Sequence, residues 1–119
     1  MRRVKFEVPA DDLERATAFY REVFGWSAQR LPFDYVLVNA SGEAVDVEDA
    51  DGGISPRTEF VRGPVLIIDV DSVDDTARKV VAAGGELLND KEQVGEFGFS
   101  QYVKDSEGSV LCLWESPES

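Results

Sequence analysis

The sequence predicts an α+β domain built from two βαβββ modules, which form a curved mixed sheet with the helices outside. The first observation is an internal repeat, because the pattern that begins near Val4 begins again near Pro64. Each copy reads as strand, helix cap, helix, glycine stop and further strands, and such repeats stack to bury a shared core. The second observation is a length of 119 residues, which suits one domain. We therefore expect a single domain over residues 1–119, with modules at 1–55 and 64–115.

The first module is expected to open with a strand over residues 3–8, where polar and apolar residues alternate. Asp12 suits the N-cap of a helix over 13–24, and Gly25 suits its left-handed stop. Strands are expected over 26–31 and 35–40, with a short or bulged strand within 43–55 and a linker over 55–63. Helical spacing predicts the buried side of this helix, which comprises Leu13, Ala16, Phe19 or Tyr20, and Val23.

The second module repeats this order. Residues 65–70 form a nearly continuous apolar run, which predicts a strand buried on both sides. Ser72 suits the cap of a helix over 73–83, which ends at Gly84 and Gly85. We expect a short strand at 86–88, a polar loop at 89–95 and a hairpin of strands 97–104 and 109–115 around the turn at 105–108. The tail after Glu115 is expected to fray.

Composition restricts the partners and the compartment. The net charge of −12, from 24 acidic and 12 basic residues, would repel nucleic acids and anionic lipids. The acidity could attract a cationic ligand, or it could be a solvated surface suited to high salt. No apolar run is long enough to span a membrane, and the N-terminus enters a strand without a signal-peptide pattern. Cys112 is the only cysteine, so we expect a cytoplasmic protein without disulfides.

Strand alternation places seven candidate ligand-binding residues on the concave side of the expected sheet. They are Lys5 and Glu7 on the first strand, Val65 and Ile67 on its counterpart, and Val110, Cys112 and Trp114 on the last strand. An apolar hollow with a few polar groups is the usual small-ligand site. The strand phase leaves open whether Tyr35, Gln101 and Tyr102 reach this side.

Each candidate also has a structural interpretation. Lys5 and Glu7 could form an ion pair near solvent, Cys112 could be an inert small apolar residue, and Trp114 could belong to the core. The absence of histidine excludes Ser-His and Cys-His catalysis. The Gly-Gly pairs read as helix stops or turns rather than phosphate loops, and the acid pairs at 11–12 and 74–75 as helix-start residues.

An ordered set of short stretches covers nearly the whole chain and resembles the vicinal oxygen chelate superfamily, which includes glyoxalase I, bleomycin-resistance proteins and extradiol dioxygenases. The stretches lie at residues 6–16, 18–20, 23–26, 52–54, 69–74, 82–85, 95–98, 104–108 and 113–115. The resemblance implies the glyoxalase/bleomycin-resistance fold and a homodimer. The hollow could form within one chain or be shared by domain-swapped chains.

The resemblance also implies where a metal ion would be bound. Metal-binding members carry a histidine on the first strand of each module and a glutamate on the last strand, and these positions hold Lys5, Val65 and Cys112 here. The fourth ligand cannot be placed within residues 46–54. An ammonium group and an isopropyl group do not ligate divalent ions, and one thiolate does not complete a site. We therefore expect no metal ion, no cofactor and no catalytic residue.

The sequence leaves three functions open. The first is a metal-independent protein that binds a small hydrophobic or amphipathic molecule. The alternative is a glyoxalase- or lyase-type enzyme that uses Lys5, Glu7 or Cys112 without a metal ion, or holds a metal ion through carboxylates not placed here. A third option is a protein-interaction module with an exposed sheet.

Overall fold

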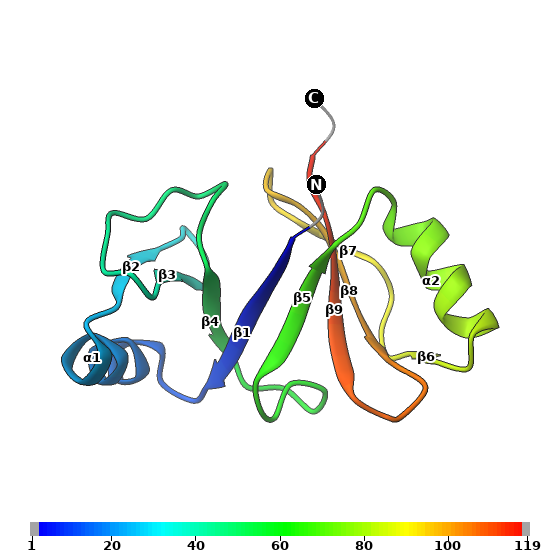
Figure 1. The fold of residues 1–119 in the computed structure, drawn as a ribbon, viewed down its shortest axis with the longest axis horizontal. Coiled ribbons are helices and arrows are strands. Elements are labelled where there is room, and N and C mark those ends of the chain that lie inside the picture. The colour runs from blue at the N-terminus through cyan, green and yellow to red at the C-terminus, as the bar shows by residue number, and fades with distance from the viewer. Residues whose placement is uncertain (1–2, 118–119) are drawn as a thin grey trace. The chain divides into compact units, whose positions relative to one another are not determined.

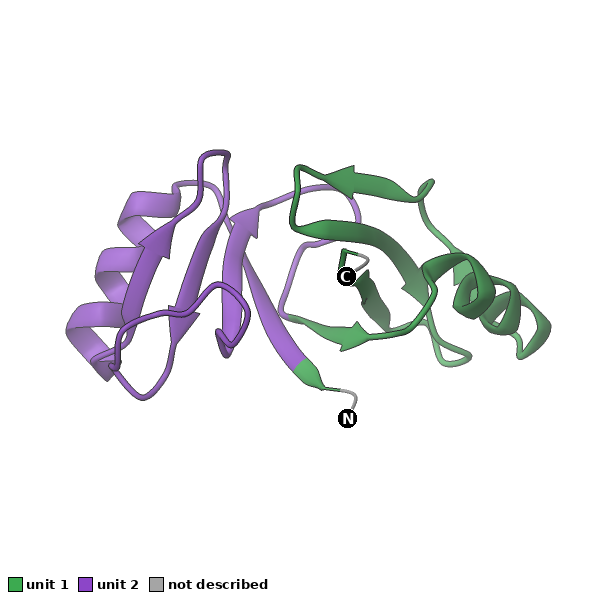
Figure 2. Cartoon of the chain, turned by 90° about the horizontal axis from the view of Figure 1, so that it is seen from above, with its two compact units in different colours: residues 1–4, 65–119 green, residues 5–64 purple. Residues whose placement is uncertain are grey.

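The computed structural model describes residues 3–117 and divides them into two compact units. The N-terminal unit comprises residues 5–64 and is purple in Figure 2. The C-terminal unit comprises residues 65–117 with Arg3 and Val4, and is green. Each unit holds one helix and a mixed sheet, which confirms the α+β class and the two βαβββ modules. Within residues 3–117, neither helix has the length and apolar character that a membrane span requires.

The N-terminal unit contains one helix and a four-stranded sheet (Figure 1). Its elements are β1 (Val4–Ala10), α1 (Leu13–Phe24), β2 (Ser27–Arg30), β3 (Val36–Asn39) and β4 (Gly52–Pro56). The strand order is β2-β3-β4-β1, in which β1 is parallel to β4 and the other pairs are antiparallel. The strand expected within residues 43–55 is therefore β4, at the end of that segment.

The C-terminal unit repeats this arrangement and adds one strand. Its elements are β5 (Val65–Asp69), α2 (Val73–Ala82), β6 (Glu86–Leu87), β7 (Glu92–Val94), β8 (Gly98–Lys104) and β9 (Val110–Glu115). The order is β5-β9-β8-β6, with β5 parallel to β9, and β7 also pairs with β8. The prediction of a polar loop at 89–95 was wrong where β7 forms. Its exposed Glu92 and Gln93 give it the polar sequence of an edge strand, which resembles a loop.

The predicted helix starts are confirmed in both units, as is the end of α1, whereas α2 ends at Ala82, one residue before its predicted end. The Asp12 carboxylate accepts a hydrogen bond from the Arg15 amide at 3.0 Å, and the Ser72 hydroxyl accepts one from the Asp75 amide at 3.1 Å. Gly25 adopts a left-handed φ of 75° after α1, which a residue with a side chain adopts only at a cost. The two modules therefore use the same start signals for their helices.

The N-terminal core lies between α1 and one face of its sheet. Ala10, Val36, Val38 and Ile54 are buried, and Leu13, Ala16 and Tyr20 of α1 pack against them. The sequence left open whether Phe19 or Tyr20 lies on the buried side of the helix. Tyr20 does, and its ring stacks on that of Trp26 with the ring centroids 4.5 Å apart. The prediction that Val23 lies on the buried face was wrong, because its side chain is 56% exposed.

The C-terminal core lies between α2 and its sheet. Val73, Val103 and Leu113 form its centre. The prediction that strand 65–70 is buried on both sides was wrong, because Leu66 is 50% exposed while Ile67 is 8% exposed. Helix α2 packs over β8 and β9, which leaves Leu66 of β5 uncovered.

Gly52 and Gly53 lie in β4, which corrects their interpretation as part of a turn. A Cβ atom on Gly52 would collide with the backbone and ring of Phe6, and one on Gly53 would collide with the Tyr35 ring. Close approach of neighbouring groups, rather than a change of chain direction, therefore requires this glycine pair.

Candidate functional site

Each sheet has one face covered by its own helix, and we call the opposite face the helix-free face. Side chains alternate along a strand, so residues next to core positions lie on the helix-free face. In the N-terminal unit, Ile54 belongs to the core, which places Gly53 and Ser55 of β4 on the helix-free face. In the C-terminal unit, Leu111 and Leu113 pack on the α2 side, which places Cys112 and Trp114 on the helix-free face. The candidate residues can be assigned on this basis.

A buried carboxylate marks the helix-free face of the N-terminal unit. Glu7 lies opposite Gly53 in the β1–β4 register and is only 3% exposed. The Tyr35 hydroxyl, which precedes β3, donates a hydrogen bond to Glu7 Oε1 at 3.0 Å. The missing side chain at Gly53 leaves room for the Tyr35 ring to cross β4. The sequence left the position of Tyr35 open, and the structure shows that it reaches Glu7.

The expected ion pair between Lys5 and Glu7 is not formed within the described part of the chain. Glu7 instead accepts the hydrogen bond from Tyr35, while Lys5 is half-buried. Hydrogen bonds compensate part of the desolvation cost of a buried carboxylate. Glu7 is therefore a stabilised polar group inside the N-terminal unit.

The helix-free face of the C-terminal unit is apolar at the corresponding positions. Ile67 is paired in register with Cys112, and both side chains are buried, as is Val65. The Cys112 thiol donates a weak hydrogen bond to the Leu113 carbonyl at 3.7 Å. A thiol that is 3% exposed lacks the accessibility of reactive cysteines, which favours its interpretation as an apolar residue.

Trp114 lies on the same face and covers Gly98 of β8. A Cβ atom on Gly98 would lie 2.8 Å from Trp114 Cζ2, and the backbone φ of 148° at Gly98 also favours glycine. Trp114 and Val110 are both half-buried. Gln101 belongs to the opposite face, where its Nε2 donates to the Asn89 carbonyl at 2.6 Å. Tyr102, which pairs with Cys112, lies on the helix-free face.

Two buried oxygen atoms have no hydrogen-bond partner among the described residues, namely Ser55 Oγ and Asp69 Oδ1. Ser55 is 5% exposed and lies on the helix-free face of the N-terminal unit. Asp69 pairs in register with Trp114 on the helix-free face of the C-terminal unit. Since a buried polar atom without a partner is costly, these oxygens are the polar groups that a bound molecule could satisfy.

The candidate ligand residues therefore divide between the units. Lys5 and Glu7 belong to the N-terminal unit. The other five belong to the C-terminal unit, where they share the helix-free face: Val65, Ile67, Val110, Cys112 and Trp114.

The residues present do not fit the metal ion of the metal-binding superfamily members. Lys5 offers an ammonium group, Val65 offers no donor atom and Cys112 offers one buried thiol. Strand β4, where the unplaced segment ends, carries no carboxylate between Gly52 and Pro56. Among the residues described, no three His, Cys, Asp or Glu side chains lie close enough to share an ion. We therefore derive no reaction step that depends on a metal ion.

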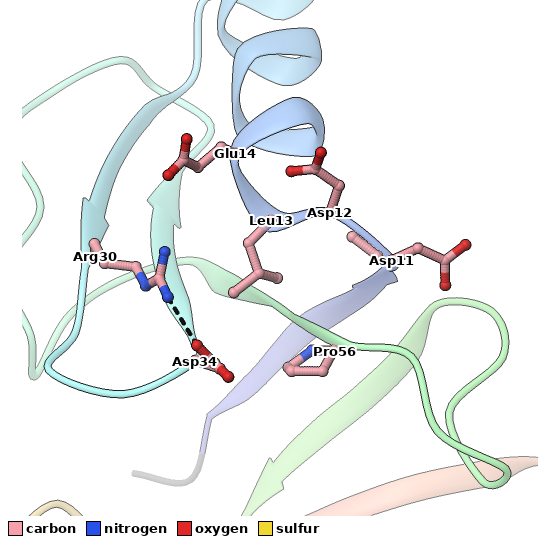
Figure 3. Close-up of a pocket in the computed structure, with 8 residues that line it drawn as sticks. Asp11, Asp12, Leu13, Glu14, Arg30, Asp34 and Pro56 are labelled. Carbon is pink, nitrogen blue, oxygen red and sulfur yellow. Dashed lines mark hydrogen bonds and ion pairs between the residues drawn. The ribbon is translucent and has the colours of Figure 1, made fainter.

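The structure also has an open depression of about 400 Å³ at the start of α1 (Figure 3). Its lining is Ala10, Asp11, Asp12, Leu13, Glu14, Arg30, Asp34 and Pro56. Arg30 binds Asp34 at 2.8 Å, Arg57 binds Asp11 at 3.1 Å and Asp12 caps the helix. These contacts hold the loops next to α1 in place, so the charged residues around the depression have a structural role.

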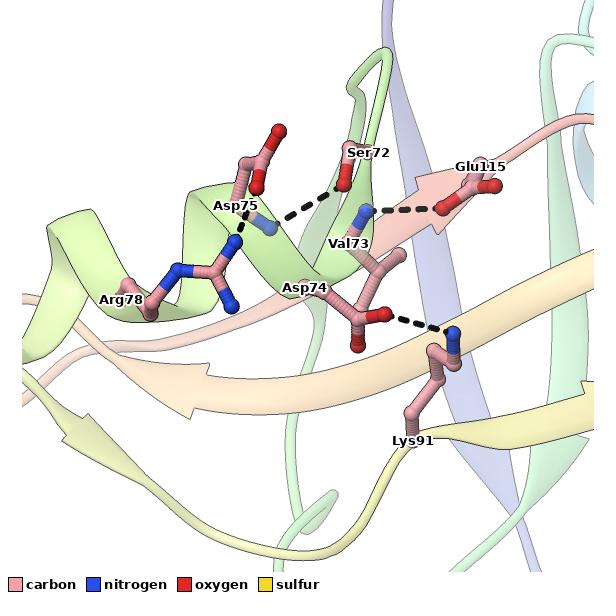
Figure 4. Close-up of polar contacts among 7 residues, drawn as sticks. All are labelled: Ser72, Val73, Asp74, Asp75, Arg78, Lys91 and Glu115. Atoms are coloured by element: carbon pink, nitrogen blue, oxygen red, sulfur yellow. Dashed lines mark hydrogen bonds and ion pairs between the residues drawn. The ribbon is translucent and has the colours of Figure 1, made fainter.

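The start of α2 is fastened differently (Figure 4). Glu115 of β9 accepts a hydrogen bond from the Val73 amide at 2.8 Å, in addition to the Ser72 cap. Asp74 binds Lys91 at 3.0 Å, and the Lys91 ammonium also lies 4.9 Å from the Phe99 ring centroid. The interpretation of the acid pairs as helix-start residues agrees with these contacts.

Comparison with known sequences gives related proteins across the chain. Residues 2–41 match the family described as bleomycin resistance protein-like N-terminal. The protein CFP32 of Mycobacterium bovis and Mycobacterium tuberculosis is 27% identical over 92% of this chain. Its name gives it a provisional assignment as a glyoxylase. The chain spans 44% of the length of CFP32. A glyoxylase-like domain-containing protein of Didymella fabae is 29% identical, with 93% of this chain and 91% of that protein covered.

Solved structures agree with the fold. A glyoxalase/bleomycin resistance protein/dioxygenase superfamily member from Vibrio splendidus has a TM-score of 0.64 at 15% identity, covering 98% of this chain and 99% of its own. Streptomyces coelicolor methylmalonyl-CoA epimerase has a TM-score of 0.70 at 16% identity and covers 98% of both chains. Likenesses at this identity establish the glyoxalase/bleomycin-resistance fold alone. Together with the sequence relatives and the repeated βαβββ modules, they support the resemblance of this chain to the vicinal oxygen chelate superfamily.

Proposed function

We propose that the protein binds a small hydrophobic or amphipathic organic molecule without a metal ion, through side chains on the helix-free face of the C-terminal unit. The observation that carries this proposal is the chemistry of the C-terminal helix-free face. Val65 and Cys112 present an aliphatic group and a thiol at positions where the metal-binding superfamily members carry a histidine and a glutamate. Ile67 and Trp114 add aliphatic and indole surface to the same face. Such a lining attracts apolar surface and has little capacity for Lewis-acid catalysis.

A polar group on the same face supports an amphipathic ligand rather than a purely apolar one. Asp69 Oδ1 is a buried oxygen without a hydrogen-bond partner among the described residues. A ligand that donates a hydrogen bond to this oxygen would recover part of its desolvation cost. Precisely placed polar groups in an apolar lining are what orient small ligands in most binding sites.

Tryptophan fluorescence tests this function directly. The protein would be titrated with decanol, decylamine, decanoate and 1-naphthol, with EDTA present throughout. We expect saturable quenching by at least one probe, because Trp114 lies on the proposed binding face. The signal should persist in Trp26→Phe, since Trp26 packs against Tyr20 and Phe6 in the helix-side core, and should be lost in Trp114→Phe.

Two controls separate binding from unspecific effects and from metal chemistry. Ile67→Ser should weaken the binding of each probe about 10-fold, because it removes apolar area from the proposed contact. Leu66→Ser, at the exposed neighbouring position on the α2 side, should leave it unchanged. Absence of saturable quenching by every probe contradicts the proposal, and so does binding that appears only after Zn²⁺ or Ni²⁺ replaces EDTA.

A further inference from the structure

Asp69 differs from the other half-buried carboxylates of the C-terminal unit in the partners of its oxygens. Asp105 Oδ1 accepts hydrogen bonds from two backbone amides of the turn before β9, at 2.8 and 2.9 Å. Glu115 accepts one from the first amide of α2. Asp69 Oδ1 is buried and has no hydrogen-bond partner within residues 3–117. Since burial of an unpaired polar atom is costly, this oxygen is a place where a ligand group would be stabilised.

Asp69 lies in a row of side chains that crosses the helix-free face of the C-terminal unit. Trp114 of β9 is its partner in register, Ser100 of β8 is the next residue of the row, and Glu92 of β7 follows. Partners in register point to the same face of a sheet, so these four side chains share the helix-free face. We call these four residues the polar row. They include two carboxylates and no basic side chain.

The next row of the same face carries apolar side chains. Ile67, Cys112 and Tyr102 pair in register two residues away from the polar row, which is about 7 Å along the strands. A molecule whose head contacts Asp69 would therefore place its apolar part on these side chains. The face has the polarity gradient that an amphipathic ligand requires.

The Trp114 indole adds an aromatic neighbour to the carboxylate. Asp69 and Trp114 are partners on adjacent strands, about 5 Å apart in backbone position. The indole covers Gly98, which has no side chain to push the ring away from the sheet. Because the face of an indole attracts cations within about 6 Å of its centre, a positive group bound at Asp69 would have a second favourable contact nearby.

The basic residues closest to this carboxylate do not pair with it. The Arg3 carbonyl accepts a hydrogen bond from the Asp69 amide at 3.0 Å, but within residues 3–117 the two side chains form no ion pair. Lys104 shares the helix-free face but is the partner of Val110, which is four residues and about 13 Å along β9 from the polar row. The carboxylate of Asp69 is therefore available to the positive charge of a ligand.

We propose, on the basis of the binding function above, that Asp69 selects ligands with a protonated amine, so that the bound molecule is an amphipathic organic ammonium ion. An alkylamine resembles the lysine side chain and is protonated at pH 7. Its ammonium group donates charge-assisted hydrogen bonds to a carboxylate, which are roughly twice as strong as neutral ones. The net charge of −12 also raises the local concentration of cations and opposes the approach of anions.

Isothermal titration calorimetry at pH 7 with EDTA tests this selectivity on the full chain. Decylammonium, decanol and decanoate have comparable apolar chains and differ in the charge of the head group. We expect decylammonium to bind at least about 10-fold more tightly than decanol, and decanoate to bind most weakly. Asp69→Asn removes the charge at nearly constant size, so it should weaken decylammonium about 10-fold and change decanol by less than about threefold. Asp69→Glu keeps the charge and should retain the preference for decylammonium.

Asp90→Asn is the matched control, because it removes the same charge from an exposed position of the same unit and should leave both dissociation constants within about twofold. Circular dichroism verifies that every variant is folded. If decanol binds and Ile67→Ser weakens it, but decylammonium has no advantage that depends on Asp69, the ammonium proposal alone is overturned. If none of the three probes binds, the binding function itself is contradicted and the ammonium proposal is overturned with it.

Discussion

The two units share a strand order but differ in chemistry at corresponding positions of their helix-free faces. Glu7 in the N-terminal unit corresponds to Ile67 in the C-terminal unit, and Gly53 corresponds to Cys112. The faces toward the helices are apolar in both units. This difference indicates that the apolar face toward the helix determines the fold of each module, whereas the residues of the helix-free face can vary without changing it. Since successive side chains point to opposite faces, one face can change without the other.

The units also differ where the helix meets the last strand. Glu115 at the end of β9 accepts a hydrogen bond from the first amide of α2. The corresponding position at the end of β4 is Pro56, whose side chain cannot accept a hydrogen bond. Helix α1 therefore depends on Asp12 for its start, while α2 has acceptors from both Ser72 and the sheet.

The largest expected effect comes from making the apolar face resemble the polar one. Ile67→Glu places a carboxylate at a site that is 8% exposed without providing the tyrosine hydroxyl that Glu7 has. We expect the free energy of unfolding to fall by about 3–5 kcal/mol, the range for an uncompensated buried charge. Urea denaturation followed by circular dichroism measures it. Leu66→Glu, at the exposed neighbouring position, should lower the free energy of unfolding by no more than about 0.5 kcal/mol. Equal losses of stability in the two variants would contradict the proposed difference between the faces.

The regular elements were predictable because several local signals agreed. The helix expected over 13–24 is α1 with the same ends, since the Asp12 cap, the apolar spacing and the Gly25 stop all point to them. Strand β7 was missed because its polar edge sequence lacks the apolar alternation that marks a strand. Agreement among independent local signals, rather than any single one, made a prediction accurate.

The candidate site was predictable only residue by residue. Alternation placed Glu7 on the face of β1 opposite Phe6 and Val8, but its partner Tyr35 is 28 positions away and precedes a strand whose phase was ambiguous. Gly53 resembled a turn residue because a sequence does not show that the Tyr35 ring must pass over it. Contacts between distant segments therefore decided what local patterns left open.

A substitution at Gly53 tests whether close approach to Tyr35 explains the glycine. Gly53→Ala should lower the free energy of unfolding by about 1–3 kcal/mol, because the added methyl group displaces the Tyr35 ring from β4. Thermal denaturation provides the measurement. Gly63→Ala is the matched control, since a Cβ atom there meets nothing within 4 Å, and it should be neutral or slightly stabilising. Similar losses for both variants would falsify this account of β4.

The hydrogen bond between Tyr35 and Glu7 can be measured by a double-mutant cycle. Tyr35→Phe should cost about 1–2 kcal/mol, because it leaves a buried carboxylate with one donor fewer. Combined with Glu7→Leu, it should show a coupling free energy of about 1 kcal/mol in chemical denaturation. Tyr20→Phe removes a hydroxyl from the same unit and keeps the stacked ring, so it should change stability by less than about 0.5 kcal/mol. Additive effects of the two substitutions would show that the pair is not energetically coupled.

The smallest expected effect concerns the acceptor that only the C-terminal unit has. Glu115→Ala removes the partner of the Val73 amide and should cost about 0.5–1 kcal/mol, since Ser72 still caps the helix. The sharper measurement is hydrogen exchange, in which the Val73 amide should lose protection while the Arg15 amide at the start of α1 is unchanged. Glu107→Ala, in the exposed turn before β9, should alter neither. If the Val73 amide keeps its protection in Glu115→Ala, both helices start on their caps alone, and the asymmetry between the units is confined to the helix-free faces.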